Sequence, residues 1–409
     1  MLSRIIVPRL NEILVKGLSI LLLGPRQTGK TTTLTDILSA FDHLSINLME
    51  TSERLRYEKN PSLVTQEAKA AHQRTVFIDE IQRVPEILDD VQVLIDSEKM
   101  TFALTGSSAR KLRRKGVNLL PGRIINFRLD PLISLEYGAI LKIDDEQGLK
   151  SILKHGELPR IVTLLGESEP GLARDLLRSY VTTYLEEEVR AEALVRSIGS
   201  FTRFLKLAAE ASGRLVSLRS MAQDLGINHA TISGHFQILE DCLIVERIES
   251  LTPAGERGRY RKAPKFVFFD VGVRNAAAEV LGPADFTNEY WGGLFEQWVG
   301  LSLLRLMRAQ GLDGRLHYWR DYGGREVDWV IDLGGEWIPI EVKWGENLRA
   351  DDLRHLEYFA RTYGDKVKRG YVVFTGPRDR EISDKILALS YRDFLPAILG
   401  TSAASPSRP

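Results

Sequence analysis

The chain has 409 residues, more than one ordinary hydrophobic core accommodates, so we expect two to four domains. Hydrophobic residues make up 44% of it and charged residues 27%, which is typical of a globular protein and excludes a disordered one. The 55 basic residues balance the 55 acidic ones, so any surface that binds nucleic acid must be local. A single cysteine, Cys242, excludes an internal disulfide, and no apolar run reaches the roughly 20 residues of a membrane span. Without the pattern of a secretory signal at the N-terminus, we expect a cytoplasmic protein that has no membrane segment.

Apolar runs and turn signals divide the chain into five expected segments. Four short apolar runs, "LSILLLG", "HLSINLM", "TVFIDE" and "MTFALTG", alternate with helical patterns and predict a doubly wound α/β domain. A helical pattern, a helix-turn-helix pattern and a second strand-bearing α/β region follow. The expected segments are 1–140 (α/β domain), 141–200 (helical linker), 201–265 (winged-helix-like), 266–400 (second α/β domain) and 401–409 (disordered tail).

The stretch "GPRQTGKT", from Gly24 to Thr31, matches the phosphate-loop pattern and lies between an expected strand and an expected helix. Its glycines let backbone N–H groups surround phosphate oxygens at the positive end of the following helix. Lys30 is expected to reach the β- and γ-phosphates of ATP, and the Thr31 hydroxyl to bind Mg²⁺. The residues expected to contact the nucleotide or its magnesium ion are Gly24, Pro25, Arg26, Gln27, Thr28, Gly29, Lys30, Thr31, Thr32 and Asp79.

Two further strands carry the expected chemistry of ATP hydrolysis. "TVFIDE" ends in Asp79, expected to hold Mg²⁺, and Glu80, expected to act as general base on the attacking water. An acid pair that caps the next helix is an alternative interpretation. In "TFALTGSS", Ser107 is the candidate sensor of the γ-phosphate, with Thr105 behind it. Arg123 in "LPGRI" is the candidate arginine finger, a role that requires a homo-oligomer.

These motifs resemble those of prokaryotic AAA-superfamily ATPases that are fused to a carboxy-terminal domain of uncharacterised function. The resemblance rests on "LLLGPRQTGKTT", "VFIDEIQRVPE", "LTGSS", "LPGRIINFRLDPLISLEYG" and "HGELPR", and it covers nearly the whole chain. It implies ATP binding and hydrolysis with Mg²⁺, but no particular substrate.

The segment "SLRSMAQDLGINHATISGHFQILEDCLIVERI" predicts a helix, a turn at "GIN", a second helix and a strand, the order found in winged-helix domains. The second helix contains no lysine or arginine, so a packing or partner-docking role is favoured over reading of DNA. His229 and His235 are expected at the surface. The expected core residues are Met221, Leu225, Ile232, Phe236 and Leu239.

Two basic runs are the alternative contacts for a nucleic-acid backbone. The run 110–115 predicts either a solvated helix face or phosphate contacts. The cations of "GERGRYRKAPK" are the better candidates for gripping DNA; they are Arg257, Arg259, Arg261, Lys262 and Lys265.

The stretch "GGREVDWVIDLGGEWIPIEVKWGE" predicts a hairpin about Gly334-Gly335. Pairing about this turn sets Asp328 opposite Glu341, and Lys343 points to the same side. We expect this polar face to be solvated and the opposite face, which is apolar, to pack on a core. Pro339 suggests an edge strand or a bulge, because it cannot donate to the ladder.

Two acids and a lysine in this arrangement suit metal-assisted cleavage of phosphodiesters. The spacing of Asp328 and "EVK", from Glu341 to Lys343, resembles the PD-(D/E)XK nuclease superfamily, and with it a restriction-endonuclease-like fold. The resemblance implies a further glutamate, Glu296, in the expected amphipathic helix "NEYWGGLFEQWVGLSLLRLM", and Mg²⁺ or Mn²⁺ on Asp328 and Glu341. An ordinary hairpin with charged residues on its wet side is the alternative.

The first functional hypothesis is an ATP-driven machine whose carboxy-terminal nuclease acts on DNA. The second is a nucleotide-dependent switch that binds DNA or protein without cutting. A pure ATPase with a structural tail has the least support in the sequence.

Overall fold

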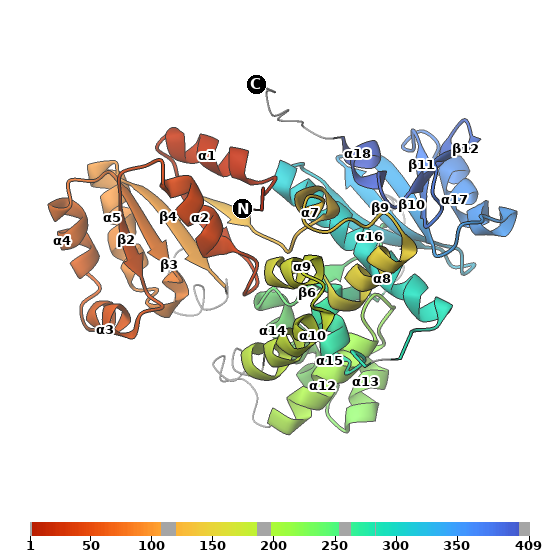
Figure 1. The fold of residues 1–409 in the computed structure, drawn as a ribbon, viewed down its shortest axis with the longest axis horizontal. Coiled ribbons are helices and arrows are strands. Elements are labelled where there is room, and N and C mark those ends of the chain that lie inside the picture. Colours follow the sequence, from red (N-terminus) through yellow and green to blue (C-terminus); the bar gives the residue numbers. More distant parts are fainter. Residues whose placement is uncertain (1, 108–119, 186–197, 253–262, 283, 401–409) are drawn as a thin grey trace. The chain divides into compact units, whose positions relative to one another are not determined.

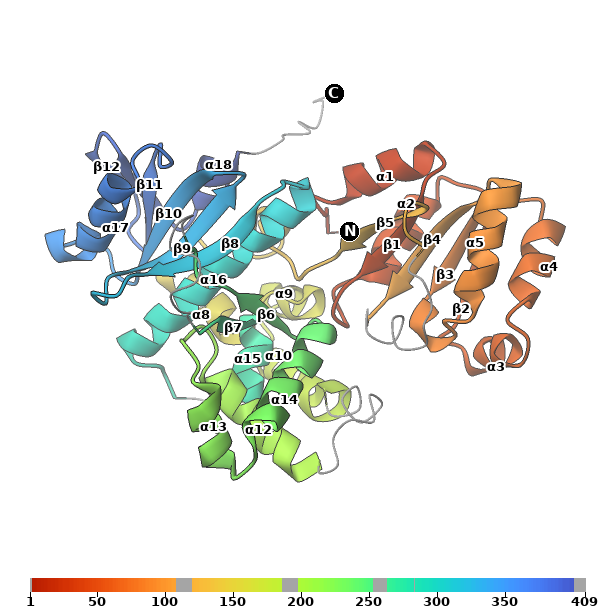
Figure 2. The ribbon, with the colours of Figure 1, turned by 180° about the vertical axis from the view of Figure 1, so that it is seen from behind.

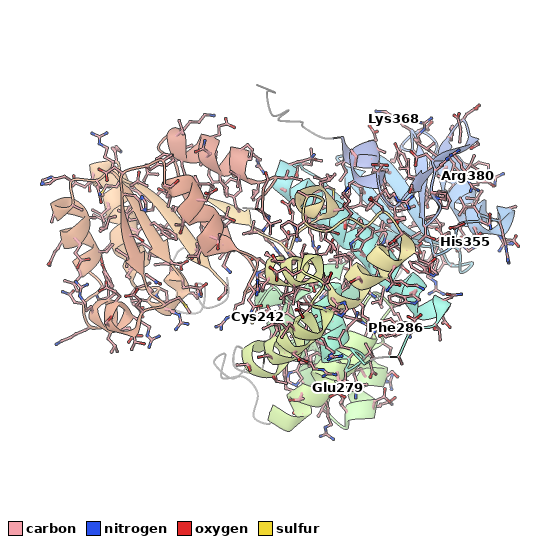
Figure 3. All side chains as sticks on the ribbon, viewed as in Figure 1. Cys242, Glu279, Phe286, His355, Lys368 and Arg380 are labelled. Carbon is pink, nitrogen blue, oxygen red and sulfur yellow. The ribbon has the colours of Figure 1, made fainter. Side chains whose placement is uncertain are left out.

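The computed structural model describes residues 2–107, 120–185, 198–252, 263–282 and 284–400 (Figure 1). The chain divides into two compact units, which we call unit 1 (residues 1–132 and 237–244) and unit 2 (residues 133–236 and 245–409). In the described parts of both units, no helix is long and apolar enough to cross a membrane. Cys242, which is labelled in Figure 3, is buried.

Unit 1 contains a parallel sheet of five strands in the order β2-β3-β4-β1-β5 (Figure 2). The strands are β1 Ser19–Leu23, β2 His43–Asn47, β3 Thr75–Asp79, β4 Thr101–Gly106 and β5 Ile124–Arg128. The four apolar runs of the sequence supply the first four strands, so the prediction of a parallel α/β domain is confirmed for unit 1.

Helices cover both faces of this sheet, as the apolar character of its strands requires. Leu21 of β1 packs in one cluster with Val91 and Leu94 of α5, while its neighbours Ile20 and Leu22 are also buried and point to the other face. On that face α1 contacts β1 and α2 contacts β4. The helices of unit 1 are α1 Val7–Val15, α2 Lys30–Leu38, α3 Thr51–Lys59, α4 Leu63–Ala70, the 3-10 helix η1 Ile81–Arg83 and α5 Ile87–Glu98.

Unit 2 begins with helices and one small sheet. Its first elements are α7 Ser134–Tyr137, α8 Glu146–His155, α9 Pro159–Gly166, α10 Pro170–Ser179, the π-helix η2 Tyr180–Leu185, α12 Ile198–Glu210, α13 Leu218–Leu225, α14 His229–Asp241 (of which residues 237–241 belong to unit 1), β6 Val245–Ile248, β7 Lys265–Phe268 and α15 Val271–Ala277. Strand β7, expected to open the second α/β region, instead pairs antiparallel with β6 in a two-stranded sheet.

The predicted order of helix, turn, helix and strand is confirmed in α13, α14 and β6. Helix α13 ends at Gly226, whose φ of 65° suits glycine. The expected surface position of His235 is wrong, because its ring is buried against Phe201 and Phe204 at centroid distances of 5.2 and 5.0 Å. Of the expected core residues, Leu225 alone is only partly buried. The basic residues 257–262 lie outside the described residues, as does the run 110–115.

The motif "HGELPR" has a structural role inside unit 2. The buried Glu157 carboxylate accepts hydrogen bonds from Tyr137, from the Trp298 indole at 2.9 Å and from Arg305. Gly156 is required beside it, because a Cβ there would lie 2.1 Å from an oxygen of Asp270. Removal of Arg305, on α16 (Asn288–Gln310), would leave the buried Glu157 carboxylate without its cation, which is destabilising.

The second sheet of unit 2 has six strands in the order β12-β13-β11-β10-β9-β8 (Figure 2). Its elements and helices are α16 Asn288–Gln310, β8 Arg315–Arg320, β9 Glu326–Leu333, β10 Glu336–Lys343, α17 Ala350–Thr362, β11 Gly370–Phe374, β12 Arg380–Ser383, β13 Ile386–Ser390 and α18 Phe394–Leu399. Gly300 of α16 packs against Trp329 of β9 on one face, and Phe359 of α17 packs against Trp337 of β10 on the other. Helix α16 is therefore buried on most sides, not amphipathic as expected: 14 of its 23 residues are buried.

The hairpin between β9 and β10 has the predicted register, with pairs from Leu333–Glu336 to Trp329–Ile340 about the Gly334-Gly335 turn. Pro339 nevertheless lies in an interior strand, not at an edge. Its missing N–H faces β11, as does the N–H of Trp337, and pairing with β11 starts only at Ile340. The proline therefore removes no ladder hydrogen bond.

Candidate functional site

The phosphate loop joins β1 to α2 at the carboxyl end of the sheet of unit 1. Gln27 and Gly29 have positive φ values of 64° and 92°, which turn the loop back toward α2. A Cβ on Gly24 would lie 2.3 Å from the Leu129 carbonyl oxygen, so only glycine fits there. The buried Lys30 ammonium donates to the carbonyl oxygens of Gly24 and Pro25, both at 3.0 Å. The loop is thus folded around its own lysine.

Thr31 and Asp79 come together at the start of α2 and the end of β3. The Thr31 hydroxyl lies 3.0 Å from both carboxylate oxygens of Asp79. The buried Thr105 hydroxyl donates to Asp79 from the neighbouring strand β4. Burial raises the pKa of Asp79, and the hydroxyls of Thr105 and Thr31 oppose that rise. Hydroxyl and carboxylate oxygens side by side form the donor set that Mg²⁺ prefers.

Glu80 and Ser107 lie beside this pair, and a residue that the sequence did not single out links them. Glu80 has a left-handed backbone, φ 59°, and its N–H donates to the Thr105 hydroxyl at 2.8 Å. The buried Gln82 amide donates to the Glu80 carboxylate and to the Ser107 hydroxyl. In the sequence only the spacing of "IDEIQ" could have indicated this contact. The 3-10 helix η1 brings residue 82 back toward residue 80.

Arg123 does not point at this site within its own chain. Its guanidinium donates to both oxygens of Asp96 on α5, at 2.7 and 2.9 Å, and both side chains are largely exposed. A second residue missed by sequence reasoning, Arg4, donates to the carbonyl oxygens of Thr28 and Asp130 and so ties the N-terminal segment to the phosphate loop. No motif surrounds Arg4 that could have indicated this.

The second candidate site is a carboxylate cluster in unit 2, formed by Glu296, Asp328 and Glu341. Asp328 lies just beyond the last ladder pair, and its carboxylate accepts the N–H of Val342 at 2.8 Å. The Lys343 ammonium lies 2.9 Å from Glu341. The structure thus brings the three predicted residues of the hairpin together.

Glu296, on α16, also belongs to the cluster, and it is bonded to a lysine that the sequence predicted to contact DNA. The Lys265 ammonium, on β7, donates to Glu296 at 2.8 Å and lies over the rings of Tyr318 and Trp329. The expectation that Lys265 contacts DNA is therefore wrong, since it is buried in an ion pair. The sequence does not indicate this ion pair, because Lys265 and Glu296 are far apart along the chain.

Glu341 is buried, which contradicts the expected solvated face, whereas Asp328 and Glu296 are half-buried. Glu341 is 5% exposed, and α17 covers the hairpin face that it shares with Trp337. Burial, followed by the Asp328 carboxylate, raises the pKa of Glu296 to about 7 and that of Glu341 well above its ordinary value. Burial also raises the pKa of Asp328, against the pull of Lys265. Burial would lower the pKa of Lys343, but the Glu341 carboxylate raises it.

Cation binding at this cluster has one observation for it and one against it. The buried Oε2 of Glu341 has no hydrogen-bond partner among the described residues, and a cation would satisfy it. Yet in the described ranges no group of three or more His, Cys, Asp or Glu side chains is arranged to hold a metal ion. At most two carboxylates, Asp328 and Glu341, could therefore serve as ligands together.

The first site lies in a region that is similar to a known domain family. Residues 17–138 match the family model described as an AAA domain, and this range includes the phosphate loop, Asp79 and Ser107. Residues 17–138 are thus similar to AAA domains. Beyond the AAA domain, residues 146–284 and 291–394 match two families described as domains of unknown function, DUF8612 and DUF4143.

Relatives of the chain occur in bacteria and archaea. A protein of Mycobacterium tuberculosis described as uncharacterized is 26% identical over 340 residues, which are 82% of this chain and 72% of the relative. One of Methanocaldococcus jannaschii, also described as uncharacterized, is 24% identical over 430 residues, covering 92% of this chain and 84% of the relative. The similarity thus extends well past the AAA domain in both.

Two solved structures are distantly similar. The Walker-type ATPase PABY2304 of Pyrococcus abyssi has a TM-score of 0.47 at 16% identity, covering 66% of this chain and 94% of its own. The replication initiator DnaA bound to AMPPCP and single-stranded DNA has a TM-score of 0.33 at 14% identity, covering 57% and 86%.

Proposed function

We propose that the protein binds ATP with Mg²⁺ and hydrolyses it in the AAA domain. The observation that carries this proposal is the contact of the Thr31 hydroxyl with both oxygens of Asp79 at 3.0 Å, directly beside Lys30. A preformed pair of oxygen ligands next to a phosphate loop fits a magnesium nucleotide and has little use otherwise.

Each residue of the site has a role in this proposal. Lys30 leaves the loop carbonyls and binds the β- and γ-phosphates, while the N-terminus of α2 stabilises their charge. Thr31 and Asp79 hold the Mg²⁺, which when bound neutralises developing charge on the phosphates. Glu80 accepts a proton from the attacking water, and Ser107 contacts the γ-phosphate. Arg123 contacts the nucleotide of a neighbouring subunit, once released from Asp96.

Two variants test the ATPase. Lys30→Ala should abolish binding of a fluorescent ATP analogue, whereas Glu80→Gln should bind it normally and lose turnover by about 10²- to 10⁴-fold. The matched control is Lys16→Ala, which removes an exposed lysine paired with Glu12 in the same unit. Wild-type turnover in Glu80→Gln would reject the general base, and tight binding by Lys30→Ala would reject the site.

The carboxylate cluster favours a second candidate function, metal-dependent hydrolysis of phosphodiesters in DNA. It rests on the meeting of Asp328, Glu341 and Lys343, with an unpartnered buried oxygen on Glu341 in the described part of the chain. Asp328 and Glu341 would hold Mg²⁺ or Mn²⁺, which activates water and polarises the phosphate. Lys343 orients that water and offsets negative charge.

Plasmid nicking with Mg²⁺ or Mn²⁺, with and without ATP, tests the second function. Asp328→Ala and Lys343→Ala should abolish nicking, and the controls Asp351→Ala and Lys368→Ala, at exposed positions of the same unit, should retain it. Equal cutting by all variants would assign the activity to a contaminant. If the wild type cuts under no condition, the rival reading is favoured, a nucleotide-dependent switch that binds DNA or protein through unit 2.

A further inference from the structure

Gln82 is the one described residue that hydrogen-bonds to both Glu80 and Ser107. Its side-chain amide donates to Glu80 Oε2, and to Ser107 Oγ at 2.9 Å. The Ser107 hydroxyl also lies 3.3 Å from the same Glu80 oxygen. The three side chains therefore form a closed triangle at the carboxyl ends of β3 and β4.

The orientation of the Gln82 amide follows from its neighbours. With the amide reversed, its carbonyl oxygen would face the Glu80 carboxylate, and two acceptors would oppose each other. The Gln82 oxygen Oε1 is instead buried beside Gly106 and has no hydrogen-bond partner in the described ranges. A Cβ added to Gly106 would lie only 3.0 Å from this oxygen. A glycine in β4 thus leaves the room that this amide occupies.

We propose that Gln82 is a positioning residue for ATP hydrolysis, which holds the Glu80 carboxylate in a fixed relation to Ser107. The backbone of Glu80 is already fixed by its bond to Thr105, so the amide restrains the remaining freedom, that of the side chain. When Ser107 contacts the γ-phosphate, the carboxylate is then directed at the water that attacks the same phosphorus. The inference rests on the proposed ATPase, and it adds the residue that couples the sensor to the base.

Substitution with methionine isolates the hydrogen bonds from packing, because methionine has a similar volume and no donor. Gln82→Met should lower kcat for ATP about 10- to 100-fold, with KM and the Kd of an ATP analogue changed less than about twofold. The matched control is Gln73→Met, which removes an amide bonded to Asp42 at the opposite end of β3 and should leave kcat unchanged. Gln82→Asn, which keeps an amide on a shorter side chain, should lie between Gln82→Met and the wild type.

A residue that acts through Glu80 must lose its effect when Glu80 is already disabled. In the Glu80→Gln background, Gln82→Met should cause no further loss of turnover, a non-additivity that general destabilisation would not produce. Wild-type kcat in Gln82→Met, or a loss confined to nucleotide affinity, would overturn this role and leave the ATPase standing. Absence of turnover in the wild type would overturn the proposed function, and this role with it.

Discussion

Both candidate sites gather carboxylates, but they give them different partners. In unit 1 the Asp79 carboxylate is bonded by two neutral hydroxyls, those of Thr31 and Thr105. In unit 2 Glu296 and Glu341 are each bonded by an ammonium group, from Lys265 and Lys343. A hydroxyl leaves the negative charge of its partner in place, whereas an ammonium ion neutralises it. In the second site a cation would therefore have to compete with two lysines that are already bonded to the carboxylates.

The largest expected effect follows from this contrast. Lys265→Met keeps a side chain of similar length but removes the ammonium that lies over the Tyr318 and Trp329 rings. Because this leaves the half-buried Glu296 without its cation, the free energy of unfolding of unit 2 should fall by roughly 3–5 kcal/mol. Chemical denaturation followed by tryptophan fluorescence measures it. The double variant Lys265→Met with Glu296→Gln should regain most of the loss. A loss in the single variant below about 1 kcal/mol, the size of a surface pair, would show that the lysine is not the partner that matters.

The sequence predicts which residues form the first site, but it does not predict the charged partners of the second. The ligands of the first site lie at the carboxyl end of one parallel sheet, after β1 and β3, so the positions of the motifs on their strands place Lys30, Thr31 and Asp79 together. The register of the hairpin was equally local, because the Gly334-Gly335 turn determines which residues pair.

Burial and remote partners could not be predicted, because they depend on tertiary packing. Alternation along β10 indicates that Glu341 and Trp337 share a face, but not that α17 covers it. Lys265 reaches Glu296 from another sheet, and His235 is buried by two phenylalanines of α12. In each case the neighbour is far along the chain, and its approach has no periodicity to detect.

A smaller loss is expected where the donor is neutral. Thr105→Val keeps the shape of the side chain but removes the hydroxyl that bonds Asp79 and Glu80, so we expect unit 1 to lose about 1–3 kcal/mol. Thr105→Ser, which keeps the hydroxyl, is the control and should lose less. If Thr105→Val lost as much unfolding free energy as Lys265→Met, neutral and charged donors would contribute equally, and the contrast between the two sites would be wrong.

The pH dependence of stability separates the sites further. Because the pKa of Glu296 is raised to about 7 from 4.5, the folded state binds more protons than the unfolded state between these values. Its stabilising contribution is complete below pH 4.5 and is lost as the pH rises through 7, at no more than about 1.4 kcal/mol per pH unit. Denaturation of the wild type from pH 5 to 7.5 should show this decline in unit 2, and Glu296→Gln should reduce its slope. The raised pKa values of Asp328 and Glu341 should leave part of the decline in place. An unchanged slope in that variant would place the titration on another group.

The smallest effect on stability is expected at Arg123, whose pair with Asp96 is exposed. Arg123→Ala and Asp96→Ala should leave the thermal unfolding midpoint of unit 1 unchanged within error. Their effects on turnover should differ, however, because a finger acts in the transition state: loss of the arginine should lower kcat about 10³-fold or more, whereas loss of its resting partner should not. Since a finger must come from a second copy, the specific activity of the wild type should also rise with protein concentration. Full activity of Arg123→Ala would reject the arginine-finger role and leave only the surface ion pair with Asp96.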